Sequence, residues 1–281
     1  MSDPIIEFNL YKPVSHTDAF YLVNAKATYY LKFVRVFIPN KPYEKLKPGL
    51  ELRKAVYGNI TPKEPDEKNV PNENDIERSI RRTRKSIKDY TFRNEFDHLA
   101  TFTFKEDRQD VSKCKSKMSN WLKNQQKRSG KFDYLIVPEF HKDSESIHFH
   151  ALIKGFKGRI KQSISSKTGK PLKQKGRNVY EYPGYTLGFT NVKIIDNKED
   201  TDTKVAFYIK KYITKDMPLI FGKNRYWASR GLIIPAKENN PEKWYEMIKP
   251  DREYPPNEYG RVIEFDIGKH PLIDMFWEAN K

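Results

Sequence analysis

The sequence predicts an α+β fold in which helices pack on an antiparallel sheet. Short runs of β-branched and aromatic residues alternate with stretches in which apolar residues recur at helical spacing. The order of these segments is strand, helix, three strands and helix, which is typical of an antiparallel sheet covered by helices. A length of 281 residues suits one large domain or two small ones, and is enough to bury a sizeable core.

The middle of the chain supplies these elements. The predicted strands are HLATFTF, FDYLIVPEF, SIHFHALIKGF and YTLGFTNVKII. One predicted helix follows the first strand and ends near Lys127. A second helix, DTDTKVAFYIKKYITKD, starts with residues that can cap it and ends before Pro218.

The N-terminal part is predicted to contain a strand, a linker and a helix. The segment ATYYLKFVRVFIP favours one strand that ends at Pro39. Prolines and charges from Thr61 to Glu77 indicate an exposed linker. Asn74 and Asp75 offer N-cap chemistry for the helix that follows.

That helix is predicted to be amphipathic. Its apolar residues form one stripe, made of Ile76, Ile80, Ile87 and Tyr90. Its other faces carry the cations Arg78, Arg81, Arg82, Arg84 and Lys85. These cations can form either a solvated helix face or a surface that binds phosphates.

Two further segments complete the element prediction. GRIKQSISSKTGKPLKQKGRN has almost no apolar content and many cations, so we expect a mobile basic loop. GRVIEFDIGKHPLIDMFWEAN predicts a strand and then a short helix.

The only cysteine, Cys114, limits the redox and metal chemistry of the chain. It cannot form an internal disulfide, which agrees with a reducing compartment, and it excludes a cysteine zinc cluster. Its helical spacing to Met118, Trp121 and Leu122 favours a packing role over a catalytic one. A metal ion would therefore need histidine and carboxylate ligands.

The charge of the chain predicts a polyanionic partner. Lys and Arg number 53 against 37 Asp and Glu, which gives a net charge of +16, and 14% of residues are aromatic. An anionic membrane surface would suit the charge equally, but no apolar run of about 18 residues could span a bilayer. The start of the sequence lacks the apolar core of a secretory signal, so we expect a soluble, cytoplasmic protein without a membrane partner.

A candidate metal site lies on two predicted strands. His148 and His150 flank one residue of a strand, so both imidazoles project from the same face. The segment KDSE makes a natural turn, and the resulting hairpin can place Glu139 opposite His148 as a third ligand. This donor set suits Mn²⁺ better than Mg²⁺. The rivals for the third ligand are His141, Asp143 and Glu145, and two structural histidines are the alternative to a metal site.

Two tyrosines are the candidate nucleophiles. Tyr208 and Tyr212 are four residues apart on a predicted helix, so their phenols share one face. Packing is the alternative interpretation of this spacing. The neighbouring cations Lys210, Lys211 and Lys215 favour chemistry, because a phenol with a pKa near 10 needs positive charge or a metal to react at neutral pH. A metal and a tyrosine in one site suit phosphodiester transesterification, with a 5′-phosphotyrosine as the intermediate.

Residues from about 75 to 235 resemble the HUH endonucleases that initiate rolling-circle replication in small phages and plasmids. Three segments carry the resemblance in the family's order: ATFTF, HFHAL and YIKKYITK. The segment KNRYWASRGL resembles one that often follows the tyrosine helix in this family. The resemblance implies a five-stranded antiparallel sheet with the HFHAL strand at its centre, and a metal-dependent enzyme that nicks single-stranded or hairpin origin DNA.

Several roles follow from the same resemblance. Tyr212 matches the nucleophile that precedes a motif lysine, here Lys215, and Tyr208 matches the second tyrosine of two-tyrosine initiators. His148 and His150 match the metal pair, with Mn²⁺ or Mg²⁺ as cofactor. The implied partners are origin DNA and a host helicase and polymerase in a bacterial cell. No Gly-rich phosphate loop is present, so no fused helicase is expected.

The predicted organisation has three parts: an N-terminal extension (1–74), a catalytic domain (75–235) and a C-terminal extension packed on the core (236–281). Arg225 and Arg230 are candidates for phosphate contacts, and Trp227 for base stacking or burial.

Three alternative functions remain open from the sequence. The same active site would serve a transposase or a relaxase, and a degenerate site would leave a DNA-binding protein without activity. An RNA-binding module would need exposed aromatics on the sheet, for which Phe102, Phe104 and Phe149 are candidates, although core packing also explains them.

Overall fold

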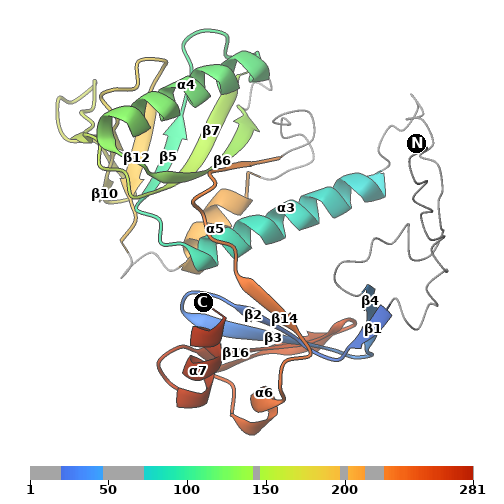
Figure 1. Ribbon diagram of the computed structural model, residues 1–281. Helices are drawn as coiled ribbons and strands as arrows, with labels where there is room; N and C mark the ends of the chain where they lie inside the picture. Colours follow the sequence, from blue (N-terminus) through green and yellow to red (C-terminus); the bar gives the residue numbers. More distant parts are fainter. Residues whose placement is uncertain (1–19, 47–72, 142–145, 197–201, 213–224, 281) are drawn as a thin grey trace, which may run out of the picture. The chain divides into compact units, whose positions relative to one another are not determined.

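The computed structural model describes residues 20–46, 73–141, 146–196, 202–212 and 225–280, and Figure 1 shows their helices and strands. They form antiparallel sheets with helices, which confirms the α+β class. Contacts divide the chain into two compact units, unit 1 (residues 1–70 and 236–281) and unit 2 (residues 71–235). Among the described helices, none is long and apolar enough to cross a membrane.

Unit 2 consists of α3 (Glu73–Arg93), β5 (His98–Phe102), α4 (Val111–Ser129), β6 (Asp133–Phe140), β7 (Ile147–Lys154), β8 (Lys161–Gln162), β9 (Lys173–Gln174), β10 (Arg177–Asn178), β11 (Tyr180–Glu181), β12 (Thr190–Ile194), α5 (Asp202–Lys210) and β13 (Trp227–Ala228). The main sheet has the strand order β13-β6-β7-β5-β12-β11-β8. It therefore has seven strands where about five were expected, and β7 lies between β6 and β5.

Both faces of this sheet are covered, by α4 on one side and by α3 and α5 on the other (Figure 1). Alternate residues of β7 serve the two faces, since Phe149 packs in the cluster under α4 and Leu152 in the cluster under α3 and α5. Phe102, Phe104 and Phe149 are all buried in the first cluster. They are core residues and cannot stack on RNA bases.

Helix α3 begins earlier than the sequence indicated. It starts at Glu73, so Asn74 and Asp75 lie inside its first turn and the predicted N-cap is wrong. Acidic residues in that turn complement the helix dipole instead. The predicted apolar stripe is confirmed, because Ile80 and Ile87 are buried. The predicted linker lies outside the described residues up to residue 72.

Helix α4 carries the cysteine as predicted. Asp110 caps its first turn by accepting a hydrogen bond from the Lys113 backbone N–H at 2.9 Å. Cys114, Met118 and Leu122 are all buried. Burial raises the pKa of the Cys114 thiol to about 11, which suits packing and not nucleophilic chemistry.

The basic segment after β7 is folded, and not the mobile loop that its composition indicated. It contains β8, and β9 pairs with β10. A further bridge joins Ile164 to Pro171. Backbone pairing supplies here the order that apolar side chains do not.

Unit 1 consists of β1 (Phe20–Val23), β2 (Lys26–Tyr29), β3 (Phe33–Pro39), β4 (Tyr43–Leu46), β14 (Ala236–Asn239), α6 (Trp244–Met247), β15 (Arg252–Asn257), β16 (Gly260–Asp266) and α7 (Pro271–Ala279). Its main sheet has the order β14-β2-β3-β16-β15, and β1 pairs with β4 separately. Strands from both ends of the sequence thus share one sheet, whose core includes Phe265, Trp244 and Trp277.

Two predictions fall in unit 1. The segment ATYYLKFVRVFIP forms β2 and β3 and not a single strand, because the chain turns where the Tyr30 N–H bonds to the Phe33 carbonyl at 3.0 Å. The predicted strand and helix near the C-terminus are confirmed as β16 and α7.

Candidate active site

The β6–β7 hairpin presents the predicted metal ligands on one face of the sheet. Glu139 pairs directly with His148, as the predicted hairpin requires, and Val137 pairs with His150. Side chains two residues apart on a strand share a face, so Glu139, His148 and His150 all project toward the side of α3 and α5. The turn with Asp143 and Glu145 lies outside the described residues.

His150 forms a hydrogen-bonded chain with a carboxylate and a hydroxyl. Its Nε2 lies 2.6 Å from Glu139 Oε2, and its Nδ1 lies 3.1 Å from the Thr101 hydroxyl on β5. An ionised carboxylate only accepts hydrogen bonds, so Nε2 carries the proton and Nδ1 accepts from Thr101. Burial lowers the pKa of His150, and the contact with Glu139 opposes this shift.

His148 has a different environment from His150. It is half-buried, and its ring centroid lies 4.9 Å from that of His141. Both rings line a pocket where β7 begins. The sequence had named His141 only as a rival ligand.

The tyrosine pair lies against His150. The Tyr212 ring stacks on the imidazole, with centroids 3.4 Å apart and an angle of 5° between the planes. The Tyr208 ring meets the Tyr212 ring edge-on at 5.4 Å. Helix α5 ends at Lys210, so Tyr212 stands just beyond it, with its N–H bonded to the Ile209 carbonyl at 3.3 Å. Burial raises the pKa of Tyr212, and its hydrogen bond with Tyr208 adds to the shift.

One of the predicted lysines lies beside the phenols. Lys211 Nζ is 4.5 Å from the Tyr208 ring centroid and 4.4 Å from that of Tyr212. Its charge is therefore placed to stabilise an anion near either ring. Lys215 lies outside the described residues.

The donor set can be compared with the needs of a divalent ion. Two imidazoles and a carboxylate on one sheet face are a chemically suitable set for Mn²⁺ or Mg²⁺ completed by water and phosphate. By donor type and by strand register, Glu139, His148 and His150 fit such an ion. Within the described ranges, no group of three or more His, Cys, Asp or Glu side chains is already gathered as a metal site.

The predicted DNA-binding cations differ in exposure. Arg81, Arg82, Arg84, Lys85 and Arg230 are exposed. Arg225 is buried, and its Nε donates to the Ser79 hydroxyl of α3 at 3.3 Å. Trp227 is partly buried and meets Tyr134 edge-on at 5.2 Å.

Comparison with known proteins relates this site to a replication family. Residues 97–217 match the model of a family of replication-associated proteins that is named for ORF2. The matched segment runs from the residue before β5 to beyond α5 and contains Glu139, both histidines and both tyrosines. No curated protein and no solved structure shows significant similarity to the chain. The match supports a role in replication.

Sequence reasoning missed Thr101, which orients His150. Its neighbours in the sequence are ordinary strand residues, and threonine is itself a strand former. A usable signal was the alternation of β5, because Thr101 pairs with His150 and so shares its face.

Proposed function

We propose that this protein initiates DNA replication by nicking single-stranded or extruded origin DNA with a tyrosine nucleophile. The observation that carries the proposal is the stacking of Tyr212 on His150, which is itself bonded to Glu139, inside the segment that matches a replication-associated family. A phenol, an imidazole and a carboxylate in direct contact form a site for phosphoryl transfer.

The proposed reaction is a transesterification. Tyr212 Oη attacks the scissile phosphorus, so an Oη–P bond forms while the bond from phosphorus to the 3′ oxygen breaks. The phenol proton is lost to solvent, and the departing oxygen takes up a proton to become a 3′ hydroxyl. The product is a 5′-phosphotyrosine. Because the phosphoester is retained, a 3′ hydroxyl can attack it later and rejoin the strand.

The surrounding residues have distinct proposed roles. Lys211 stabilises negative charge on the phenol or phosphate, which matters because burial opposes ionisation of Tyr212. Tyr208, in contact with Tyr212, serves as the second nucleophile. Glu139, His148 and His150 would hold Mn²⁺ or Mg²⁺, which would polarise the scissile phosphate. Lys215 is proposed as a further catalytic cation.

The proposed products define the partners. A free 3′ hydroxyl is a primer for a polymerase, and strand displacement beyond the nick requires a helicase. We therefore propose that host enzymes of these two classes act after this protein.

Trapping of a covalent adduct tests the proposal. The full chain is incubated with Mn²⁺ and labelled single-stranded oligonucleotides that tile the replicon's own DNA. The wild type should form a denaturant-resistant adduct, and Tyr208→Phe combined with Tyr212→Phe should abolish it, because neither phenol remains. Tyr259→Phe, at an exposed tyrosine of unit 1, is the matched control. Adduct formation by the double variant would refute the assignment, and DNA binding without any adduct from the wild type would favour a non-enzymatic role.

A further inference from the structure

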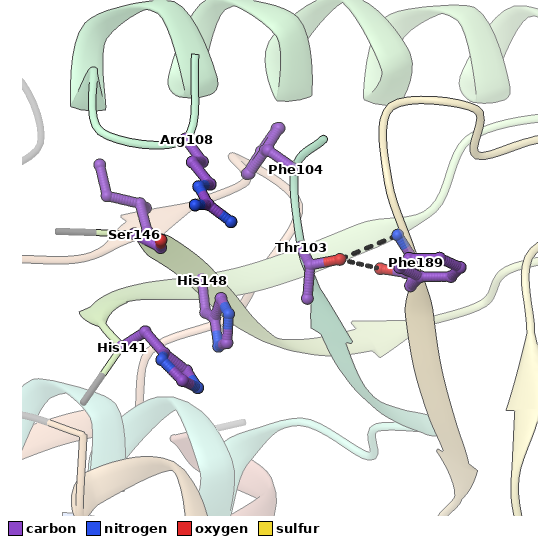
Figure 2. A pocket seen from close by; sticks show the side chains of 8 residues that line it. Thr103, Phe104, Arg108, His141, Ser146, His148 and Phe189 are labelled. Carbon is purple, nitrogen blue, oxygen red and sulfur yellow. Dashed lines mark hydrogen bonds between the residues drawn. The ribbon is translucent and has the colours of Figure 1, made fainter. Parts of the chain in front are cut away.

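A pocket opens next to the candidate active site, where β5 ends and β7 begins. Its volume is about 300 Å³, and its lining includes Thr103, Arg108, His148 and Phe189 (Figure 2). His148 belongs both to this pocket and to the strand pair with Glu139. The pocket is therefore continuous with the surface on which the proposed chemistry takes place.

Phe189 is an exposed aromatic on a tightly held backbone. Its relative exposure is 75%, yet its N–H bonds to the Thr103 hydroxyl at 2.9 Å and its carbonyl accepts from the Thr103 N–H at 2.9 Å. Lys105 Nζ lies 5.8 Å from the ring centroid. A rigid, exposed ring beside a cation is what stacking on a nucleic-acid base requires.

Arg108 provides positive charge at the same pocket. Its side chain is exposed, while its carbonyl accepts a hydrogen bond from the Ile147 N–H at 2.7 Å, so its backbone is fixed to the start of β7. The neighbouring Asp107 has a positive φ of 54° and pairs with Lys113 and Lys117. The local carboxylate is thus engaged by lysines of α4, and within the described residues Arg108 has no acidic partner.

We propose that this pocket binds the nucleotide next to the scissile phosphate of single-stranded DNA, with Phe189 stacking on its base and Arg108 contacting its phosphate. A duplex could not use the ring in this way, because its bases are already stacked. The place of the nucleotide beside the scissile bond rests on the proposed function, whereas the stacking and charge contacts do not.

Binding measurements without divalent ions test the pocket separately from nicking. The full chain is titrated into a fluorescent oligothymidylate of about 16 nucleotides in the presence of a chelator, and anisotropy gives Kd. Phe189→Ala should weaken binding by about ten-fold, because one base loses its stacking partner. Phe189→Leu should weaken it similarly, since it keeps apolar bulk without a ring, and Phe189→Tyr should retain it.

Arg108 is tested through the salt dependence of Kd. Arg108→Ala should reduce the slope of log Kd against log salt by about 0.7, the value for one phosphate contact with a single strand. Arg108→Lys should preserve the slope. The matched controls are Tyr259→Ala, an exposed aromatic in unit 1, and Arg128→Ala, an exposed arginine at the far end of α4. Both should bind as the wild type does.

The outcomes separate this proposal from the proposed function. If Phe189→Ala and Phe189→Leu bind as tightly as the wild type, or Arg108→Ala keeps the full salt slope, the pocket is not the nucleotide site. Tighter binding of oligouridylate than of oligothymidylate would overturn DNA as the ligand. Absence of a covalent adduct, together with weaker binding by the Phe189 variants, would refute nicking and support the stacking and charge contacts of the pocket.

Discussion

His150 has hydrogen-bond partners at both ring nitrogens, and these fix its orientation. Glu139 accepts from Nε2, and the Thr101 hydroxyl lies at Nδ1. Because the ring also stacks on Tyr212, a rotation of the imidazole would disturb the carboxylate and the phenol together. Thr101 is thus a positioning residue that acts on the site through His150.

Replacement of Thr101 by valine should lower the nicking rate without unfolding the protein. Thr101→Val keeps the shape of the side chain but removes the hydroxyl at Nδ1, so we expect a loss of about ten-fold. Thermal unfolding should change little, since a single hydrogen bond contributes about 1 kcal/mol. Nicking rates measured across a Mn²⁺ titration check this.

Thr101→Ser is the matched control because it restores the hydroxyl. It should recover most of the rate and return the Mn²⁺ dependence toward that of the wild type. Equal nicking rates for the valine variant and the wild type would rule out a positioning role.

Residue patterns were informative where chemistry follows from regular spacing. Strand alternation put His148 and His150 on one face, and helical spacing put Tyr208 and Tyr212 together, and both arrangements are observed. Phe189 and Arg108 could not be found in this way. Each is exposed in a connection, and their nearness depends on how three separate strands meet.

At the scale of elements, the approach of the chain to the end of β5 depends on a glycine. A Cβ on Gly188 would lie 2.1 Å from the Thr103 carbonyl oxygen, far inside any real contact. Only glycine allows the two backbones to lie this close, and this contact brings Phe189 to the pocket.

Gly188→Ala should therefore destabilise unit 2 by about 1–3 kcal/mol, because backbone must move to admit the methyl group. Gly184→Ala is the matched control. Its Cβ would meet only the flexible Gln125 side chain, at 3.1 Å, so we expect a smaller effect. Denaturant unfolding of both variants checks this, and equal stabilities for the two would contradict the steric argument.

Element prediction failed where short backbone pairings decide the structure. The segment from β8 to β10 lacks apolar residues, but paired strands of two residues order it. The turn between β2 and β3 falls within an unbroken run of strand formers, so composition gave no sign of it. The long amphipathic helices α3 and α4 were predicted well because their apolar stripes face clusters of buried residues.

At the scale of the whole molecule, unit 1 depends on ionised carboxylates. Asp251 accepts hydrogen bonds from the Asp266 N–H at 2.8 Å and from Lys269 Nζ at 2.9 Å. His270 Nε2 lies 3.1 Å away. Although burial opposes ionisation, these contacts outweigh it and lower the pKa of Asp251 to about 2.

Acid should therefore weaken unit 1 in a defined range. A carboxyl with a lowered pKa contributes stability above its unfolded value, near 3.8, and loses it as the pH falls toward about 2. Asp251→Asn should reduce stability near neutral pH by about 1–2 kcal/mol after solvent screening and should flatten the loss between about pH 4 and pH 2.

The pH dependence is followed by tryptophan fluorescence during denaturant unfolding. Trp244 and Trp277 report on unit 1, whereas Trp121 and Trp227 report on unit 2. Replacement of the first pair by phenylalanine provides the control, because the acid-sensitive signal should then disappear. An unchanged acid profile for Asp251→Asn would show that other carboxylates govern it.

The shared sheet of unit 1 also sets an order for folding during synthesis. Strand β3 emerges early from the ribosome, but its neighbour β16 follows only after all of unit 2 has been made. Unit 2 is one uninterrupted stretch of chain, so it can reach its native form first, as domains do during translation. Premature termination after residue 235 would leave β3 without its neighbour β16 and β2 without its neighbour β14, as exposed edges that invite aggregation.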